Sequence, residues 1–147
     1  LHYLYKAGFR GQLVQITVGF ITYAEMYTLG KAVQTAIENT RQKVAVLASG
    51  DLSHRLIPGS PAGYNPAGKI FDEQIVAGLR EMDCKALFSL DPQMVEDAGE
   101  CGLRPIFFLM GCLDGLEADA RVLSYEGPFG VGYAVATFRV KGQKTKE

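Results

Sequence analysis

The residue best suited to acid–base chemistry in this sequence is His54, within the run Ser49-Gly50-Asp51-Leu52-Ser53-His54-Arg55. An imidazole exchanges a proton near neutral pH, and Asp51 or Ser53 could fix its tautomer. The run follows a short apolar segment, 44–48, that predicts a buried strand, and ligands of open α/β sheets gather beyond the carboxyl ends of strands. The Asp-x-x-His spacing is unspecific, so an ordinary loop histidine stays open as the alternative. His2 is interpreted as a packed or surface histidine.

A carboxylate and a thiol, Glu100 and Cys101, stand together at a second place. They precede a segment, 103–116, that predicts an amphipathic helix, so they lie where backbone N–H groups and the helix dipole favour anions. Either side chain could bind a metal; equally, Glu100 could cap the helix and Cys101 could pack as a small hydrophobe. Core packing is enough to explain Cys112. Glu126 ends a predicted strand and could reach the same site or be solvated.

Composition favours one globular domain without nucleic-acid or membrane partners. The chain has 147 residues, 48% of them hydrophobic, which is enough apolar material for a core. Its formal charge is −1 and its 15 basic residues are spread out, so no basic stripe marks a nucleic-acid surface. No apolar run approaches the ~20 residues that span a bilayer. The three cysteines indicate reduced thiols, so we expect a soluble, cytoplasmic protein.

Hydrophobic periodicity indicates an α/β fold. The segment 12–20 predicts a strand, 24–40 an amphipathic helix and 44–48 a second strand, which together predict a βαβ unit with parallel pairing. Three further helices are expected at 69–82, from an Asp83 cap through Leu90, and at Pro92–Ala98 between an Asp91 cap and a Gly99 stop.

The C-terminal part of the chain predicts a hairpin. Strands are expected at 121–126 and 131–140, joined by the turn 127–130. We therefore expect a mostly parallel sheet flanked by helices, with a C-terminal β-hairpin. The domain should span 1–140, followed by a flexible tail at 141–147.

Four motifs, taken together, resemble the class III extradiol dioxygenase superfamily with its LigB-like catalytic subunit. The nearest branch is the AmmeMemoRadiSam system protein B group, which is related to Memo proteins. The likeness covers essentially the whole chain. The motifs are 48–56 (ASGDLSHRL), 63–72 (GYNPAGKIFD), 96–104 (EDAGECGLR) and 123–133 (LSYEGPFGVGY).

This resemblance implies a site and an activity. Family enzymes bind non-haem Fe(II) through two histidines and one carboxylate, which leaves positions for a small aromatic substrate and O₂. By motif, His54 is the acid–base residue, with Asp51 beside it, and Glu100 is the third metal ligand, with the Cys101 thiolate as the alternative. Ser53 and Glu126 are expected to lie next to these groups and to contact them without binding the metal themselves.

The resemblance also implies that the chain is the C-terminal part of a domain. The family's two metal-binding histidines come from an N-terminal part that these residues lack, so that part or a second subunit should supply them. We expect no iron on this chain alone, and a homo-oligomer is compatible with the sequence. The leading hypothesis is ring cleavage of a catechol-like substrate. The alternatives are a Memo-like metal- or phosphopeptide-binding protein without that activity, and a scaffold partner.

Overall fold

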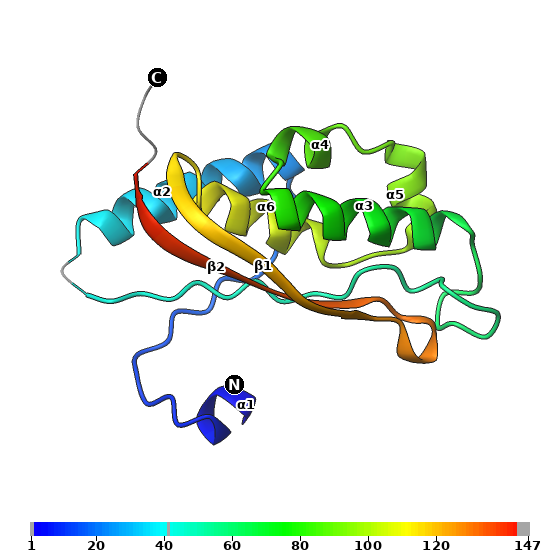
Figure 1. Cartoon of the computed structure of the whole chain (residues 1–147), viewed down its shortest axis with the longest axis horizontal. Coiled ribbons are helices and arrows are strands. Elements are labelled where there is room, and N and C mark those ends of the chain that lie inside the picture. The colour runs from blue at the N-terminus through cyan, green and yellow to red at the C-terminus, as the bar shows by residue number, and fades with distance from the viewer. Residues whose placement is uncertain (1, 41, 144–147) are drawn as a thin grey trace.

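The computed structural model describes residues 2–40 and 42–143, in which helices pack beside a long antiparallel β-hairpin (Figure 1). Helix α3 packs against both strands of the hairpin and against α4 and α5, whereas α2 packs against α6. The elements in chain order are α1 (His2–Lys6), α2 (Tyr23–Glu38), α3 (Ala67–Glu81), α4 (Cys84–Phe88), α5 (Pro92–Ala98), α6 (Leu103–Cys112), β1 (Leu116–Glu126), the 3-10 turn η1 (Pro128–Gly130) and β2 (Tyr133–Gln143).

Local capping signals define the short helices as predicted. The Asp83 carboxylate accepts a hydrogen bond from a backbone N–H of the first turn of α4 at 3.0 Å. Asp91 does the same for α5 at 3.1 Å, with Pro92 as the first helical residue. Gly99 ends α5 in the left-handed conformation, with φ of 62°. These caps satisfy backbone groups that the helix itself leaves unpaired, which is why they could be predicted from the sequence.

The longer helices differ from prediction only at their ends. Thr22 and Glu25 form a capping box, so α2 begins at Tyr23. The helix ends at Glu38, two residues earlier than expected. Helix α6 was expected through residue 116, but it ends at Cys112, and Gly115 with φ of 71° turns the chain into β1.

Two glycines bring α2 and α6 into backbone contact. A Cβ at Gly30 would overlap the Phe108 carbonyl oxygen, and one at Gly111 would overlap the Tyr27 carbonyl oxygen. Close approach of two helices at glycines lets the flanking side chains interlock. Those side chains join residues of α3 and α4 in one core, whose largest fully buried apolar members are Phe71, Phe107, Met26, Ile75, Leu87, Leu103 and Met110.

The predicted C-terminal hairpin is confirmed and is longer than expected. Strand β1 pairs antiparallel with β2 from Leu116 opposite Gln143 to Glu126 opposite Tyr133, with two register shifts. The turn between them contains η1, where Phe129 takes the left-handed conformation at φ of 58°. Residues 141–143, expected in the tail, belong to β2, and residues 144–147 of that tail lie outside the described residues.

The parallel sheet is not confirmed by the structure. The sheet formed by residues 2–40 and 42–143 has two strands, β1 and β2, and they run antiparallel. The segments 12–20 and 44–48, expected as strands, contain no regular strand. Their sequences favour an extended backbone, but a strand also needs a neighbour to bond with, and these segments have no ladder partner within the described chain.

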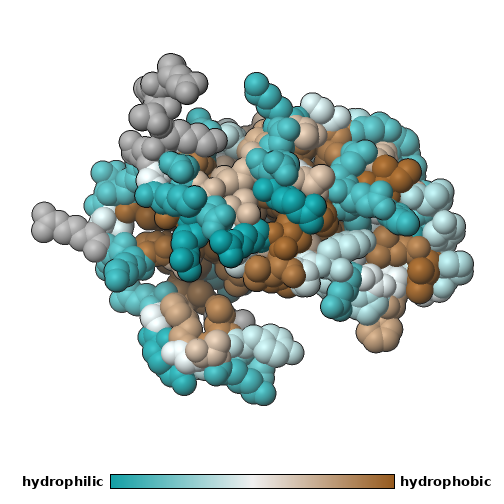
Figure 2. Space-filling view, in the orientation of Figure 1, coloured by the Kyte–Doolittle hydropathy of each residue, from teal (hydrophilic) through white to brown (hydrophobic). Residues whose placement is uncertain are grey.

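Both extended segments carry exposed apolar side chains. Figure 2 shows apolar surface, in brown, where the chain runs from α1 toward the helices. The exposed members are Leu13, Val14, Ile16, Val18 and Phe20 in the first segment and Val44 and Leu47 in the second. The patterns that predicted buried strands therefore describe residues that are accessible to solvent here. Separately, no helix within the described ranges is long and apolar enough to cross a membrane.

Candidate functional site

The site begins where two backbone segments cross. The Cys101 backbone N–H donates a hydrogen bond to the Asp51 carbonyl oxygen at 3.3 Å. Glycines make this approach possible, because a Cβ at Gly50 would lie 2.6 Å from the Gly102 Cα atom. A Cβ at Gly102 would lie 2.7 Å from the Asp51 carbonyl oxygen. The crossing therefore holds the loop after residue 50 against the N-terminus of α6.

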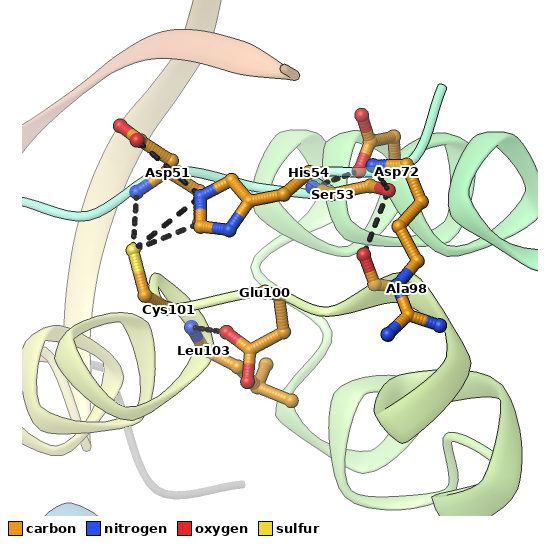
Figure 3. Close-up of polar contacts among 9 residues, drawn as sticks. Asp51, Ser53, His54, Asp72, Ala98, Glu100, Cys101 and Leu103 are labelled. Atoms are coloured by element: carbon orange, nitrogen blue, oxygen red, sulfur yellow. Dashed lines mark hydrogen bonds and ion pairs between the residues drawn. The ribbon is translucent and has the colours of Figure 1, made fainter. Parts of the chain in front are cut away.

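Three candidate site side chains meet at this crossing (Figure 3). His54 Nε2 lies 3.4 Å from Asp51 Oδ2 and 3.9 Å from Cys101 Sγ. The Asp51 backbone N–H donates to Cys101 Sγ at 3.2 Å. The potential ligand atoms of the three side chains all lie within 4.8 Å of one another. We call Asp51, His54 and Cys101 the three-residue cluster.

The cluster is accessible from solvent. The side chains of His54 and Asp51 are 25% and 41% exposed, and Cys101 is an exposed residue. An imidazole, a carboxylate and a thiol are the usual protein ligands of transition metals, and the first two also exchange protons. The cluster can therefore bind a cation or transfer a proton to an external molecule.

A network of hydrogen bonds holds the backbone at Ser53 and His54. The His54 backbone N–H donates to the Ala98 carbonyl oxygen at 3.1 Å, and Ser53 Oγ donates to the same oxygen at 2.9 Å. The Ser53 backbone N–H donates to Asp72 Oδ1 at 2.8 Å, and the Tyr125 hydroxyl donates to Asp72 Oδ2 at 2.6 Å. Ser53, singled out from the sequence, is thus hydrogen-bonded to Asp72 and Ala98 directly before His54 in the chain.

Asp72 was not assigned a role from the sequence. It is fully buried, and burial raises the pKa of its carboxyl group, opposed by the hydrogen bonds from Tyr125 and Ser53 and by nearby His54. The available signal was its place on the buried face of α3 beside Phe71 and one turn before Ile75. A carboxylate on such a face needs hydrogen-bonding partners, because unpaired burial is costly.

Glu100 lies next to the cluster but its carboxylate caps α6. Glu100 Oε2 accepts a hydrogen bond from the Leu103 backbone N–H at 2.6 Å. Burial raises the pKa of the Glu100 carboxyl group, while the Leu103 hydrogen bond and the charges of Arg104 and His54 oppose this. Cys101, and not Glu100, is thus in direct contact with His54 and Asp51.

The other singled-out residues lie apart from the cluster. Glu126 is exposed at the end of β1, and none of the polar contacts of the cluster described above involves it. His2 is exposed in α1 and its ring meets the Tyr3 ring edge-on. Cys112 is buried in the core, which raises the pKa of its thiol to about 11 and agrees with the packing interpretation. Two surface hollows, of about 250 and 200 Å³, lie between α3 and α4 and on the hairpin, away from the cluster.

The chain belongs to the family of catalytic LigB subunits of aromatic ring-opening dioxygenases, whose family model matches residues 1–136. It is 41% identical over 135 residues to Protein CA_C1420 of Clostridium acetobutylicum, covering 92% of this chain and 29% of that protein. It is 34% identical over 109 residues to the 3,4-dihydroxyphenylacetate 2,3-dioxygenase of Escherichia coli, covering 69% of this chain and 40% of that enzyme. The chain thus spans less than half the length of either relative.

Proposed function

We propose that this chain is part of a non-haem Fe(II)-dependent extradiol dioxygenase that cleaves a catechol-like ring with O₂, and that His54 is its acid–base residue. The observation that carries the proposal is the contact of His54 Nε2 with Asp51 and Cys101 at an accessible surface. Membership of the ring-opening dioxygenase family supports the reaction class. Fe(II), when bound, would supply a site that holds the substrate hydroxyl oxygens and O₂ together.

The residues of the cluster fit part of such a metal centre. Such a centre takes two histidines and one carboxylate, and because His54 is assigned to proton transfer in this proposal, the cluster supplies neither of those histidines. In the proposal, a further part of the polypeptide or a second subunit supplies the missing histidines. Glu100 remains the ligand that family resemblance favours, but its Oε2 is engaged by the Leu103 N–H, whereas Cys101 Sγ, which accepts the Asp51 N–H, lies within the cluster 3.9 Å from His54 Nε2. The geometry therefore favours Cys101.

Within this proposal, His54 handles the substrate proton. Nε2 faces the cluster, so it is the atom that would accept a proton from a bound catechol hydroxyl and return it later. Asp51 Oδ2 lies 3.4 Å from the same nitrogen and would orient the ring when Nε2 carries a proton. The buried hydrogen bonds of the Ser53 and His54 backbone keep the imidazole at this place.

The test is a comparison of variants in the complete protein, with the remaining ligands present and Fe(II) added. His54→Ala should leave iron content nearly unchanged and lower catechol turnover by ~10²–10⁴-fold, the usual contribution of a positioned acid or base. Cys101→Ala should lose iron first if the thiolate is the ligand, and Glu100→Ala should do so if the carboxylate is. If His54→Ala lost as much iron as the variant that removes the metal ligand, His54 would itself be a ligand. Full turnover in His54→Ala would make it an ordinary loop histidine.

The isolated chain offers a second test. One imidazole with one carboxylate and one thiol does not complete the proposed centre, so residues 1–147 alone should bind Fe(II) weakly or not at all. Metal analysis of the purified chain measures this. Stoichiometric iron on the chain alone would contradict the assignment of ligands to another part of the protein.

A Memo-like metal- or phosphopeptide-binding protein is the second candidate, and the presence of Cys101 in the cluster favours it. This function predicts metal or phosphopeptide binding by the complete protein without turnover of any catechol. Ring cleavage that depends on His54 would exclude it.

A further inference from the structure

Asp72 is the most completely enclosed charged side chain near the cluster. Its exposed fraction is 0%. It lies on α3, eighteen positions after His54 in the chain. Both carboxylate oxygens are engaged, one by the Ser53 backbone N–H at 2.8 Å and the other by the Tyr125 hydroxyl at 2.6 Å. Loss of either hydrogen bond would leave a buried polar atom unsatisfied, which is costly, so this carboxyl group is an anchor.

The anchor joins three elements to the residue before His54. Asp72 comes from α3, Tyr125 from β1, and Ser53 from the loop that carries His54. Gly132 completes the joint, since its N–H donates to the Ser53 carbonyl oxygen at 2.8 Å and a Cβ there would overlap Asp72 Oδ2. Ser53 is thus held by both its N–H and its carbonyl group, and its exposed fraction is 0%.

The fixed position of the Ser53 backbone also restricts His54. His54 follows Ser53 directly, its N–H is bonded to Ala98, and its side chain leaves the loop on the side of Cys101 and Asp51 (Figure 3). If the Ser53 backbone shifted, the His54 imidazole would move relative to Cys101, because Ser53 and His54 are consecutive residues. A displacement of ~1 Å at a reacting group can lower a rate by about 10²-fold.

We propose that Asp72 is a positioning residue that holds His54 in the cluster through its hydrogen bonds to Ser53 and Tyr125. The role in turnover rests on the proposed function, whereas the role in fixing the loop does not. The hydrogen bonds of Asp72 go to Ser53 and Tyr125 and not to a side chain of the cluster, so in this proposal its effect on the reaction passes through His54.

The experiment compares Asp72→Ala with Asp72→Asn, and uses Glu73→Ala as the control. An asparagine keeps both contacts, because its oxygen can accept from the Ser53 N–H and its amide can donate to the Tyr125 oxygen. Glu73 is the exposed neighbour of Asp72 on the same helix. Hydrogen exchange is measured at the Ser53 and His54 amides, with the α6 amides as an internal reference.

Asp72→Ala should speed exchange at Ser53 and His54 by ~10-fold or more, while Asp72→Asn restores protection and Glu73→Ala changes nothing. In the complete protein, Asp72→Ala should lower kcat by ~10–10²-fold with little change in KM. In a His54→Ala background, the same substitution should cause no further loss, because the residue through which it acts is gone.

Three results separate the outcomes. Unchanged exchange at Ser53 and His54 in Asp72→Ala would overturn the inference whatever the activity. An equal loss of kcat with and without His54 would show that Asp72 is merely structural, and would overturn it too. Faster exchange together with no ring cleavage by the unaltered complete protein would overturn the proposed function alone, and leave the anchoring of the loop in place.

Discussion

A methyl group at Gly102 should separate the two segments that form the site. In Gly102→Ala the new Cβ would lie 2.7 Å from the Asp51 carbonyl oxygen, where ordinary contact begins at 3.4 Å. Backbone atoms cannot rotate away as a side chain can, so the loop and the N-terminus of α6 must move apart by roughly 0.7 Å in the direction of the clash. The Cys101 N–H···Asp51 O hydrogen bond, already 3.3 Å long, would then be broken.

The magnitude follows from three contributions. Overpacking costs about 1–3 kcal/mol, and each hydrogen bond lost at the crossing costs about 0.5–1.5 kcal/mol. The gain from a less flexible unfolded chain is about 0.4–1 kcal/mol, and it applies in full because Gly102 has φ of −93°, which alanine adopts without strain. With one hydrogen bond lost, the net loss of unfolding free energy should be ~0.5–4 kcal/mol.

Urea unfolding measures this loss, with Gly142→Ala as the matched control. Gly142 lies in β2 and a Cβ there would have no neighbour within 4 Å, so the same chemical change should leave stability unchanged or raise it by up to about 1 kcal/mol, the gain from a less flexible unfolded chain. In Gly102→Ala, the amide of Cys101 should also exchange faster. Equal stability of the two variants, together with an unchanged Cys101 amide, would refute the argument that this crossing is sterically tight.

Three further predictions concern the core, the helix cap and the buried carboxylate. Phe107→Ala should lower the unfolding free energy by ~3–5 kcal/mol, whereas Phe20→Ala should stay within about 0.5 kcal/mol, because the first ring is fully buried and the second fully exposed; similar urea midpoints would contradict this. Glu100→Ala should cost ~0.5–2 kcal/mol in thermal unfolding through loss of the Leu103 cap, and no loss would remove the capping role. Burial raises the pKa of Asp72 above its unfolded value, so the stability from its bound proton is present below pH ~4 and is lost as the pH rises through the folded pKa. Asp72→Asn, which does not ionise, should therefore gain stability relative to the unaltered chain as the pH rises from ~4 through the folded pKa, and a constant difference in urea titrations would contradict the sign.

The sequence by itself determined the features whose causes are local. The Asp83 and Asp91 caps and the Gly99 stop act within one helical turn, so their residue types are enough to predict where α4 and α5 begin or end. The C-terminal hairpin was predicted for the same reason, since the turn joins its strands directly. Four motifs in order were enough to indicate the family that the comparisons show.

Tertiary structure decided the features that depend on distant partners. The segments 12–20 and 44–48 have the composition of strands, but strand formation needs a neighbouring backbone, and no local pattern states whether one is present. Likewise, Glu100 and Cys101 are adjacent in sequence, and only the crossing of Gly50 with Gly102 directs the thiol to His54 while the carboxylate caps α6. Side-chain direction there is set by the route of another segment, fifty residues away in the chain, which spacing along the sequence does not encode.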